Sequence, residues 1–401
     1  MSARRRDGRP GGPPDGSAAG PPGGPADGPL VYVAGSSVED VHGTDVQLVD
    51  ALAALTDVVW VDPPHRWRPG RPYGVMPGRL TDSPGVRRVA ISVPPAATRP
   101  VVRSVATRSY ARSLRRALAG TGTRSGTVVL ASWQPVLPLV PPGFRRVLYA
   151  TDDLVAAGPL WGMDTGYLTR AREANLAAAD AVVTVSEPLA DLLTRDSVRP
   201  TVLPNGCSPA TFDARAEPAP GIELPHPVAG IIGQMNERTD LRCLRAVLEH
   251  GMSLLVVGPR HYTDRAQAAE LSSILDHPRA RWVDAVPREE LPAYLAHMDV
   301  GLSAYADTAF NRSASPLKTL DYLAAGIPAV VTSVARIETT TPGAVLVADD
   351  PAHLARLARE AAGAPRDAAA LRAEAARHSW TARAGQFLGV FTGRDRASAG
   401  C

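Results

Sequence analysis

Residues Ser315–Thr332 read SPLKTLDYLAAGIPAVVT and carry the signals of a helix that leads directly into a buried strand. Ser315 is a good N-cap, and Pro316 fits the first helical position because the N–H that proline lacks has no partner there. Gly326, followed two residues later by a proline, is typical of the residue that ends a helix. The apolar run AVVT that follows has the composition of a strand. The stretch therefore predicts a helix over 316–325 and a strand directly after it.

The same alternation of apolar strands with helical segments continues on both sides of this unit. Before residue 206 the expected strands are Leu30–Ala34, Val58–Val61, Val89–Val93, Val128–Ala131, Val147–Ala150, Ala181–Val185 and Thr201–Leu203. After residue 227 they are Val228–Ile232, Leu254–Val257, Arg281–Val283, Val300–Ser303, Ala329–Thr332 and Ala344–Val347. Strands this uniformly apolar, separated by helices, predict parallel sheets covered by helices on both faces.

The pattern predicts the α/β fold class, with two successive doubly wound domains and a cleft between them. The first residues are mostly Gly, Pro, Asp, Arg and Ala, so we expect a disordered tail there. The predicted divisions are a tail over 1–28, an N-terminal domain over 29–205, a linker over 206–227, a C-terminal domain over 228–378 and a last helical segment over 379–395. Ligands of such sheets bind at the carboxyl ends of the strands, so the cleft is the expected site.

The bulk composition is that of a soluble globular protein. The chain has 401 residues, of which 45% are hydrophobic and 21% charged, and a net charge of +3. Its three cysteines, Cys207, Cys243 and Cys401, stand in no spacing typical of zinc ligands and are too scattered for a disulfide framework. Since no signal peptide and no apolar run of about 18 residues occurs, we expect a cytoplasmic protein.

Segment 83–151, the arginine-rich segment, is strongly basic. It holds eleven arginines and no acidic residue, so it carries +11, and the rest of the chain carries −8 because the whole chain is +3. Arg108, Arg112 and Arg115 fall on one face of a predicted helix, which is typical of a basic helix on a membrane surface. No aromatic interleaving or nucleic-acid motif accompanies them, so an anionic membrane surface or an anionic substrate is favoured and nucleic acid is not expected. A solvated helix in an arginine-rich chain explains the pattern equally well.

Lys318 is the single lysine among 43 basic residues. It falls in the first turn of the predicted helix, where the free amides of Leu317 and Lys318 and the helix dipole attract an anion. Asp321, one turn later, can accept hydrogen bonds from a diol. Together these groups predict a site for a nucleoside diphosphate; the alternative is an ordinary capped helix with a Lys–Asp pair. Because the wide planar fork of arginine would crowd such a site, composition bias alone does not explain why a lysine stands here.

The stretch SPLKTLDYLAAGIPAVVT resembles the donor-binding helix of retaining glycosyltransferases of the GT-B fold, family 4, and in particular bacterial members that glycosylate cell-wall or lipid-linked polymers of the teichuronic-acid type. Eight other blocks between residues 30 and 390 agree in order: VYVAGSSVEDVHGTDVQLVDALA, VVWVDPP, VLYATDD, AADAVVTVSEPLADLL, VLPNG, GIIGQMNERTDL, LLVVGP and ELPAYLAHMDVGLSAY. The resemblance implies the GT-B fold, in which both domains are Rossmann-like and face each other across this cleft, a nucleoside-diphosphate sugar bound to the C-terminal domain, no cofactor and no required metal. It also implies that the last helix, 379–395, crosses back to the N-terminal domain.

The resemblance implies roles for individual residues. Gly233 would let the backbone approach the diphosphate, and Arg238 would neutralise it. Leu317 and Lys318 would hold phosphate, and Asp321 would bind the ribose, where the family usually has Glu. The full donor-binding set is Gly233, Asn236, Arg238, Val286, Ser315, Pro316, Leu317, Lys318 and Asp321.

Candidate acceptor residues follow strands of the N-terminal domain. Asp152 and Asp153 come directly after a strand, and we expect them to face the cleft and position the acceptor; the alternative is a helix N-cap plus a solvent carboxylate. The loop after the first strand is where the acceptor or its phosphate would approach, although a lone histidine there is more often an ordinary loop residue; its candidates are His42, Gly43 and Thr44. The catalytic candidates are Asp152, Asp153, Arg238 and Lys318.

Two positions depart from the family pattern. Ser313 stands where the family has an acidic residue that contacts the donor sugar, and Ser132-Trp133-Gln134 stands where many members have a histidine. The predicted function is transfer of a sugar, with retention, from a nucleoside-diphosphate sugar to a hydroxyl of a lipid-linked or cell-wall polysaccharide. The alternatives are a nucleotide-sugar 2-epimerase of the same architecture and a non-catalytic nucleotide-sugar-binding subunit. We expect a cytoplasmic location, peripheral on the inner face of the membrane if the arginine-rich segment binds lipid.

Overall fold

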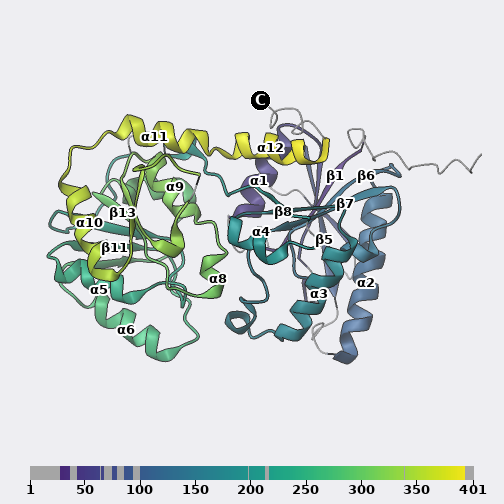
Figure 1. Cartoon of the computed structure of the whole chain (residues 1–401), viewed down its shortest axis with the longest axis horizontal. Coiled ribbons are helices and arrows are strands. Elements are labelled where there is room, and N and C mark those ends of the chain that lie inside the picture. Colours follow the sequence, from purple (N-terminus) through teal and green to yellow (C-terminus); the bar gives the residue numbers. More distant parts are fainter. Residues whose placement is uncertain are drawn as a thin grey trace, which may run out of the picture.

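The computed structural model describes residues 28–36, 43–63, 65–66, 75–78, 85–93, 100–196, 198–212, 216–337 and 339–392. They form two lobes that lie side by side, each a sheet with helices around it (Figure 1). We call the lobe built around the first sheet the N-lobe and the other the C-lobe. The predicted tail lies outside the described residues except for Gly28.

The N-lobe sheet is centred on β1 (Leu30–Val33), whose residues are all buried. β1 pairs in parallel with β2 (Val58–Val61) and with β6 (Gly126–Leu130). The strand order is β3-β5-β2-β1-β6-β7-β8-β9, and β4 pairs antiparallel with β5 at one side. The other strands are β3 (His65–Arg66), β4 (Val75–Gly78), β5 (Val86–Val93), β7 (Phe144–Ala150), β8 (Ala181–Thr184) and β9 (Thr201–Val202).

Side chains of β1 alternate between two cores, one on each face of this sheet. Tyr32 packs with α1 (Thr44–Ala53) and α4 (Glu187–Leu193) on one face. Val31 and Val33 pack with α2 (Pro100–Ala119) on the other, where α3 (Thr165–Ala178) also contributes. Both faces are therefore covered, which is what strands that are apolar at every position require.

The C-lobe sheet is entirely parallel, in the order β12-β11-β10-β13-β14-β15. Its strands are β10 (Val228–Ile232), β11 (Ser253–Val257), β12 (Ala280–Val283), β13 (Val300–Ser303), β14 (Ala329–Thr332) and β15 (Val345–Ala348). One face packs against α5 (Leu241–Glu249), α6 (Arg265–Leu275) and α10 (Pro351–Gly363). The other packs against α7 (Leu291–Leu295), α9 (Leu317–Ala324) and α11 (Ala368–Arg377).

The predicted α/β fold class is confirmed, since both lobes are Rossmann-like sheets whose strands are parallel except for β4. Several strands agree with the prediction residue for residue: Val58–Val61, Val228–Ile232, Val300–Ser303 and Ala329–Thr332. The predicted start of the helix at 316–325 is wrong, because α9 begins at Leu317 and its N-cap is Pro316, not Ser315. Ser315 is bonded to the N-lobe instead: its Oγ accepts a hydrogen bond from the backbone N–H of Asn205 at 3.2 Å.

The last helix, α12 (Trp380–Thr392), leaves the C-lobe and packs on the N-lobe; in Figure 1, α11 and α12 together run along one edge of the two lobes. The buried Trp380 donates from Nε1 to Oε1 of Gln47 in α1 at 3.0 Å. Phe387 packs edge-on against Tyr149 of β7, with ring centroids 5.1 Å apart. The N-lobe core therefore includes a helix from the far end of the chain, and this packing holds the two lobes together.

Candidate functional site

The strands of both lobes end at a common cleft that holds a cavity of about 520 Å³. The N-lobe lines it with residues that follow β1, β6 and β7. The C-lobe lines it with residues that follow β10, β11 and β13 and with the first turn of α9. Because loops at the carboxyl ends of parallel strands carry the ligand sites of such folds, this cavity is the candidate active site.

Lys318 lies in the first turn of α9 and lines the cleft, half-buried. Its side chain runs against the backbone of Gly233, where a Cβ would stand only 2.6 Å from Lys318 Cε. Gly233 has a φ of +90°, so this position favours glycine on both counts. Burial lowers the pKa of Lys318, and the neighbouring Arg238 charge acts in the same direction. The ammonium is thus a confined cation that an anion in the cleft would stabilise.

Arg238 is the second cation on this wall of the cleft. Its guanidinium carbon lies 4.6 Å from the ring centroid of Phe310 and 5.0 Å from that of Tyr305. Its Nε donates to Oδ1 of the buried Asn311 at 2.8 Å, and its backbone N–H donates to Oδ1 of Asn236 at 3.1 Å. Arg238 is therefore held in one place before any ligand binds, and Asn236 contributes by shaping its turn.

Asp321 is buried at the cleft and pairs with Arg288, whose Nη2 donates to Oδ1 at 3.0 Å. Burial raises the pKa of Asp321, while the charge and hydrogen bonds of Arg288 lower it. The guanidinium of Arg288 lies 5.4 Å from the ring centroid of Phe212. The sequence reasoning missed Arg288, because its partner stands 33 residues later and no local spacing connects the two.

The two acceptor-side aspartates differ in placement. Asp152 lines the cleft, and burial raises its pKa to about 6, with the Arg238 charge acting in the opposite direction. Asp153 does not line the cleft, which corrects its sequence-based placement; it borders a smaller cavity beside it. Its Oδ1 accepts hydrogen bonds from the amides of Val155 and Ala156 at 3.1 and 3.2 Å, so it caps a turn.

Most of the remaining predicted residues also line the cleft: Gly43, Thr44, Asn236, Val286, Ser315 and Leu317. Pro316 is buried and is not among the lining residues, and His42 lies outside the described residues. Thr44 Oγ1 donates to Oδ1 of Asn205, another lining residue that the sequence reasoning missed, at 3.2 Å.

The positions that depart from the family pattern have different surroundings. Ser313 is buried and does not line the cleft; it directly follows α8 (Ala309–Arg312), and its hydroxyl donates to the carbonyl of Ala309 at 3.2 Å. Trp133 lines the cleft and packs edge-on against Tyr167, with centroids 5.8 Å apart. Trp161, which no sequence signal singled out, lines the cleft as well.

Residues 227–362 match the family model described as "Glycosyl transferases group 1". Among curated proteins, the chain is 28% identical over 109 residues to the "Putative teichuronic acid biosynthesis glycosyltransferase TuaH" of Bacillus subtilis (strain 168). That match covers 27% of this chain and 27% of the relative, so the chain is aligned with only about a quarter of that protein.

Two solved structures show the fold over nearly the whole chain. Sucrose-phosphate synthase from Thermosynechococcus elongatus matches with a TM-score of 0.68 and 18% identity, over 92% of this chain and 100% of that chain. A structure from E. coli, described as trehalose-6-phosphate bound with UDP-2-fluoro glucose, matches with a TM-score of 0.64 and 14% identity, over 91% and 99%. The GT-B fold of the chain and the group 1 match of its C-lobe together support a glycosyltransferase.

Proposed function

We propose that this chain is a retaining glycosyltransferase that moves a sugar from a nucleoside-diphosphate sugar to a hydroxyl of a lipid-linked or cell-wall polysaccharide. The observation that carries the proposal is the pair of held cations, Arg238 and Lys318, on one wall of the cleft, with the buried carboxylate of Asp321 one turn along α9. The group 1 match spans this wall. The UDP-sugar in the E. coli structure and the teichuronic acid biosynthesis of the relative support the donor and acceptor classes.

The proposed role of the two cations depends on where negative charge develops during sugar transfer. When the bond between the sugar and the diphosphate breaks, the leaving diphosphate gains negative charge. Arg238 and Lys318 are already held in place by the protein, and in the proposed reaction they would stabilise this charge without reorganisation, together with the free amides at the start of α9. These fixed cations would stabilise the leaving diphosphate, as a divalent metal does in metal-dependent enzymes. We therefore propose a reaction without metal or cofactor. Asp152 would accept a hydrogen bond from the acceptor hydroxyl and orient it.

The first test is turnover by Lys318→Arg. The variant should lose activity by about 100-fold or more, because the planar guanidinium does not fit where Lys318 already touches the Gly233 backbone. The measurement is nucleotide release from a panel of UDP- and GDP-sugars with membrane extract as acceptor source, with thermal unfolding as the control for folding. Near-full activity of Lys318→Arg would contradict the role of the ammonium. Binding of donors without release would favour the non-catalytic subunit, and interconversion of donors without release would favour the 2-epimerase.

A second prediction compares two glycines with nearly the same backbone. Gly233 and Gly343 have φ values of +90° and +87°, so Ala at either costs about 1–2 kcal/mol of stability. At Gly343 nothing lies within 4 Å of the added Cβ, whereas at Gly233 it meets Lys318. Gly233→Ala should therefore weaken UDP or GDP binding by about tenfold or more in titration calorimetry, and Gly343→Ala should not. Equal affinities would show that Lys318 does not contact the nucleotide.

A third prediction concerns pH. Since the pKa of Asp152 is raised to about 6, its carboxylate form is lost as the pH falls through that value. If this carboxylate orients the acceptor, kcat/KM of the wild type should decline below about pH 6. The Asp152→Asn variant should be about 100-fold slower, and its pH–rate profile should lack this acidic decline. Asp153→Asn is the matched control, because an amide oxygen can accept the same two turn hydrogen bonds. An unchanged acidic limb in Asp152→Asn would assign the titration to another group.

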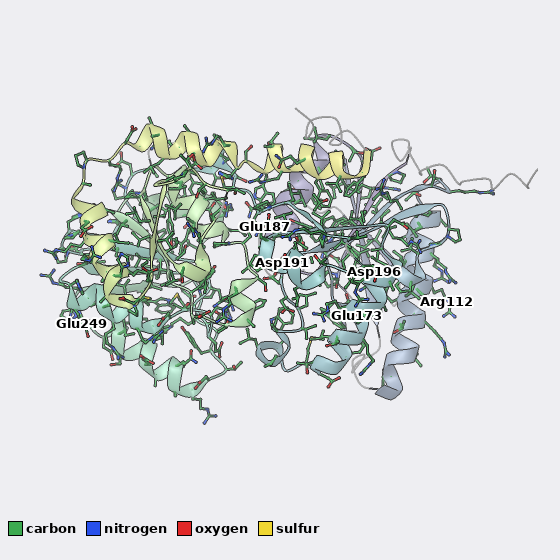
Figure 2. The ribbon with its side chains drawn as sticks, viewed as in Figure 1. Arg112, Glu173, Glu187, Asp191, Asp196 and Glu249 are labelled. Atoms are coloured by element: carbon green, nitrogen blue, oxygen red, sulfur yellow. The ribbon has the colours of Figure 1, made fainter. Side chains whose placement is uncertain are left out.

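We also propose that the N-lobe docks on anionic membranes through α2. Arg108, Arg112, Arg115 and Arg116 are exposed, while Tyr110, Leu114 and Leu118 pack into the core. Figure 2 shows Arg112 on the outer side of α2, at the edge of the N-lobe. Part of the positive charge of the arginine-rich segment is paired with carboxylates: Arg88 pairs with Asp62 at 2.7 Å, and Arg146 pairs with Asp180 at 3.0 Å. None of the helices among the described residues is long and apolar enough to cross a bilayer.

This docking predicts a charge-dependent affinity for liposomes. Replacing Arg108, Arg112, Arg115 and Arg116 by Gln should weaken binding to anionic liposomes by about 100-fold or more, and salt should weaken binding of the wild type. The control replaces four exposed arginines of the C-lobe, which changes the net charge equally: Arg245, Arg265, Arg281 and Arg356. Sedimentation with anionic and neutral liposomes measures the binding of the wild type and of the two variants. Equal binding to the two liposome types would remove the membrane part of the proposal.

A further inference from the structure

Trp161 is a large apolar side chain that is left uncovered inside the cleft. It ends a short 3₁₀ turn, Gly158–Trp161, is 47% exposed, and lines the same cavity as Asp152 and Lys318. Its indole packs edge-on against Phe310 of the C-lobe, with centroids 6.3 Å apart and planes at 77°. One edge of the ring is thus held, while much of its surface faces space that a ligand can fill.

The turn that presents Trp161 is well anchored. In the preceding turn Asp153 accepts hydrogen bonds from the amides of Val155 and Ala156, and the backbone N–H of Gly158 donates to the carbonyl of Val155 at 3.1 Å. At the end of the 3₁₀ turn Gly162 has a φ of +61°, and the backbone N–H of Trp161 itself bonds back into the turn at 3.3 Å. The indole is therefore placed by a hydrogen-bonded scaffold, which is the kind of support a binding residue needs.

The rest of the N-lobe wall combines apolar and polar surface. Trp133 and Leu154 line the cavity with apolar side chains, and Asp152 lines it with a carboxylate that can accept hydrogen bonds. A ligand that matches this wall must have an apolar face and a rim of hydroxyls. A pyranose ring has both, because its C–H groups form flat faces and its hydroxyls project around the edge.

Charge on the two walls separates two kinds of ligand. The lining cations named above all belong to the C-lobe; Arg288 is paired with Asp321, while Arg238 and Lys318 suit a diphosphate. The N-lobe wall presents the carboxylate of Asp152, which repels an anion once it is ionised. A neutral ring is therefore favoured over a phosphorylated one on the side of Trp161.

We infer that Trp161 is the stacking platform of an acceptor subsite that binds a neutral pyranose ring, with Asp152 accepting a hydrogen bond from one of its hydroxyls. The inference rests on the proposed function, because it names the acceptor class of that same site. An acceptor polymer would present its terminal sugar here, with one ring face on the indole and the reacting hydroxyl toward the donor.

The test is saturation-transfer NMR on the whole protein with UDP or GDP bound. The probes are the methyl glycosides of glucose, galactose, mannose and N-acetylglucosamine, with glucose 6-phosphate as the anionic probe. At least one glycoside should receive saturation mainly on the C–H protons of one ring face. Trp161→Ala should weaken that binding by about tenfold, and Trp161→Phe should retain most of it because a ring remains. Leu192→Ala is the control, since Leu192 is also 47% exposed but is not among the cleft-lining residues.

The outcomes separate this inference from the proposed function. If UDP and GDP both fail to bind, the proposed function fails and the inference fails with it. If a nucleotide binds and every glycoside shows no transfer, or if Trp161→Ala binds as well as wild type, only the acceptor inference is overturned. Tighter binding of glucose 6-phosphate than of methyl glucoside would contradict the preference of the subsite for a neutral ring. Loss in Trp161→Ala with unchanged nucleotide affinity and thermal unfolding would support the inference.

Discussion

The contact between the side chain of Lys318 and the backbone of Gly233 is the constraint on which the C-lobe wall of the cleft depends. Its position is set by core packing one helical turn away. The hydroxyl of Tyr322 accepts from the amide of Ile232, the last residue of β10, at 2.9 Å and donates to the carbonyl of Leu302 in β13 at 3.1 Å. Residues four apart share a helix face, so fixing Tyr322 between two strands also directs Lys318 at the turn after β10. The cation of the site is thus placed by the hydrophobic core beneath it.

The same end of α9 is bonded to the N-lobe, which fixes the C-lobe wall of the cleft relative to the N-lobe wall. Asn205, just after β9, donates from Nδ2 to the carbonyl of Ser315 at 2.8 Å, while Thr44 donates to Asn205 Oδ1. Nearby, Ser186 Oγ donates to the carbonyl of Ser313 at 2.7 Å. These bonds join the start of α1 to the start of α9 through one side chain. The width of the cleft at this end is therefore set by direct hydrogen bonds, with α12 packing as a second connection.

The sequence predicts those features of this structure that depend on neighbouring residues, and it does not predict contacts between residues that are distant in the chain. Strands such as Val228–Ile232 are predicted to the residue because every position is apolar. The helices α6 and α11 were not predicted, because α6 buries only Leu271 and Ile274 and α11 only Glu374 and Ala375, which leaves too few apolar positions for a helical period. At the site, the cluster on α9 has a local signature. The partners of Asp321 and Ser315 are distant in sequence, and no spacing rule connects them.

Arg238 lies where the two walls influence each other. Its charge lowers the pKa of Asp152 across the cleft, opposing the effect of burial. In the proposed reaction a diphosphate bound at Arg238 would bring negative charge to the same place, and this would raise the pKa of Asp152. As the bond to the sugar breaks, the leaving diphosphate becomes more negative and the effect grows. In this proposal the Asp152 carboxylate would be most basic as the bond to the sugar breaks, so Arg238 would couple departure of the diphosphate to the carboxylate that orients the acceptor hydroxyl.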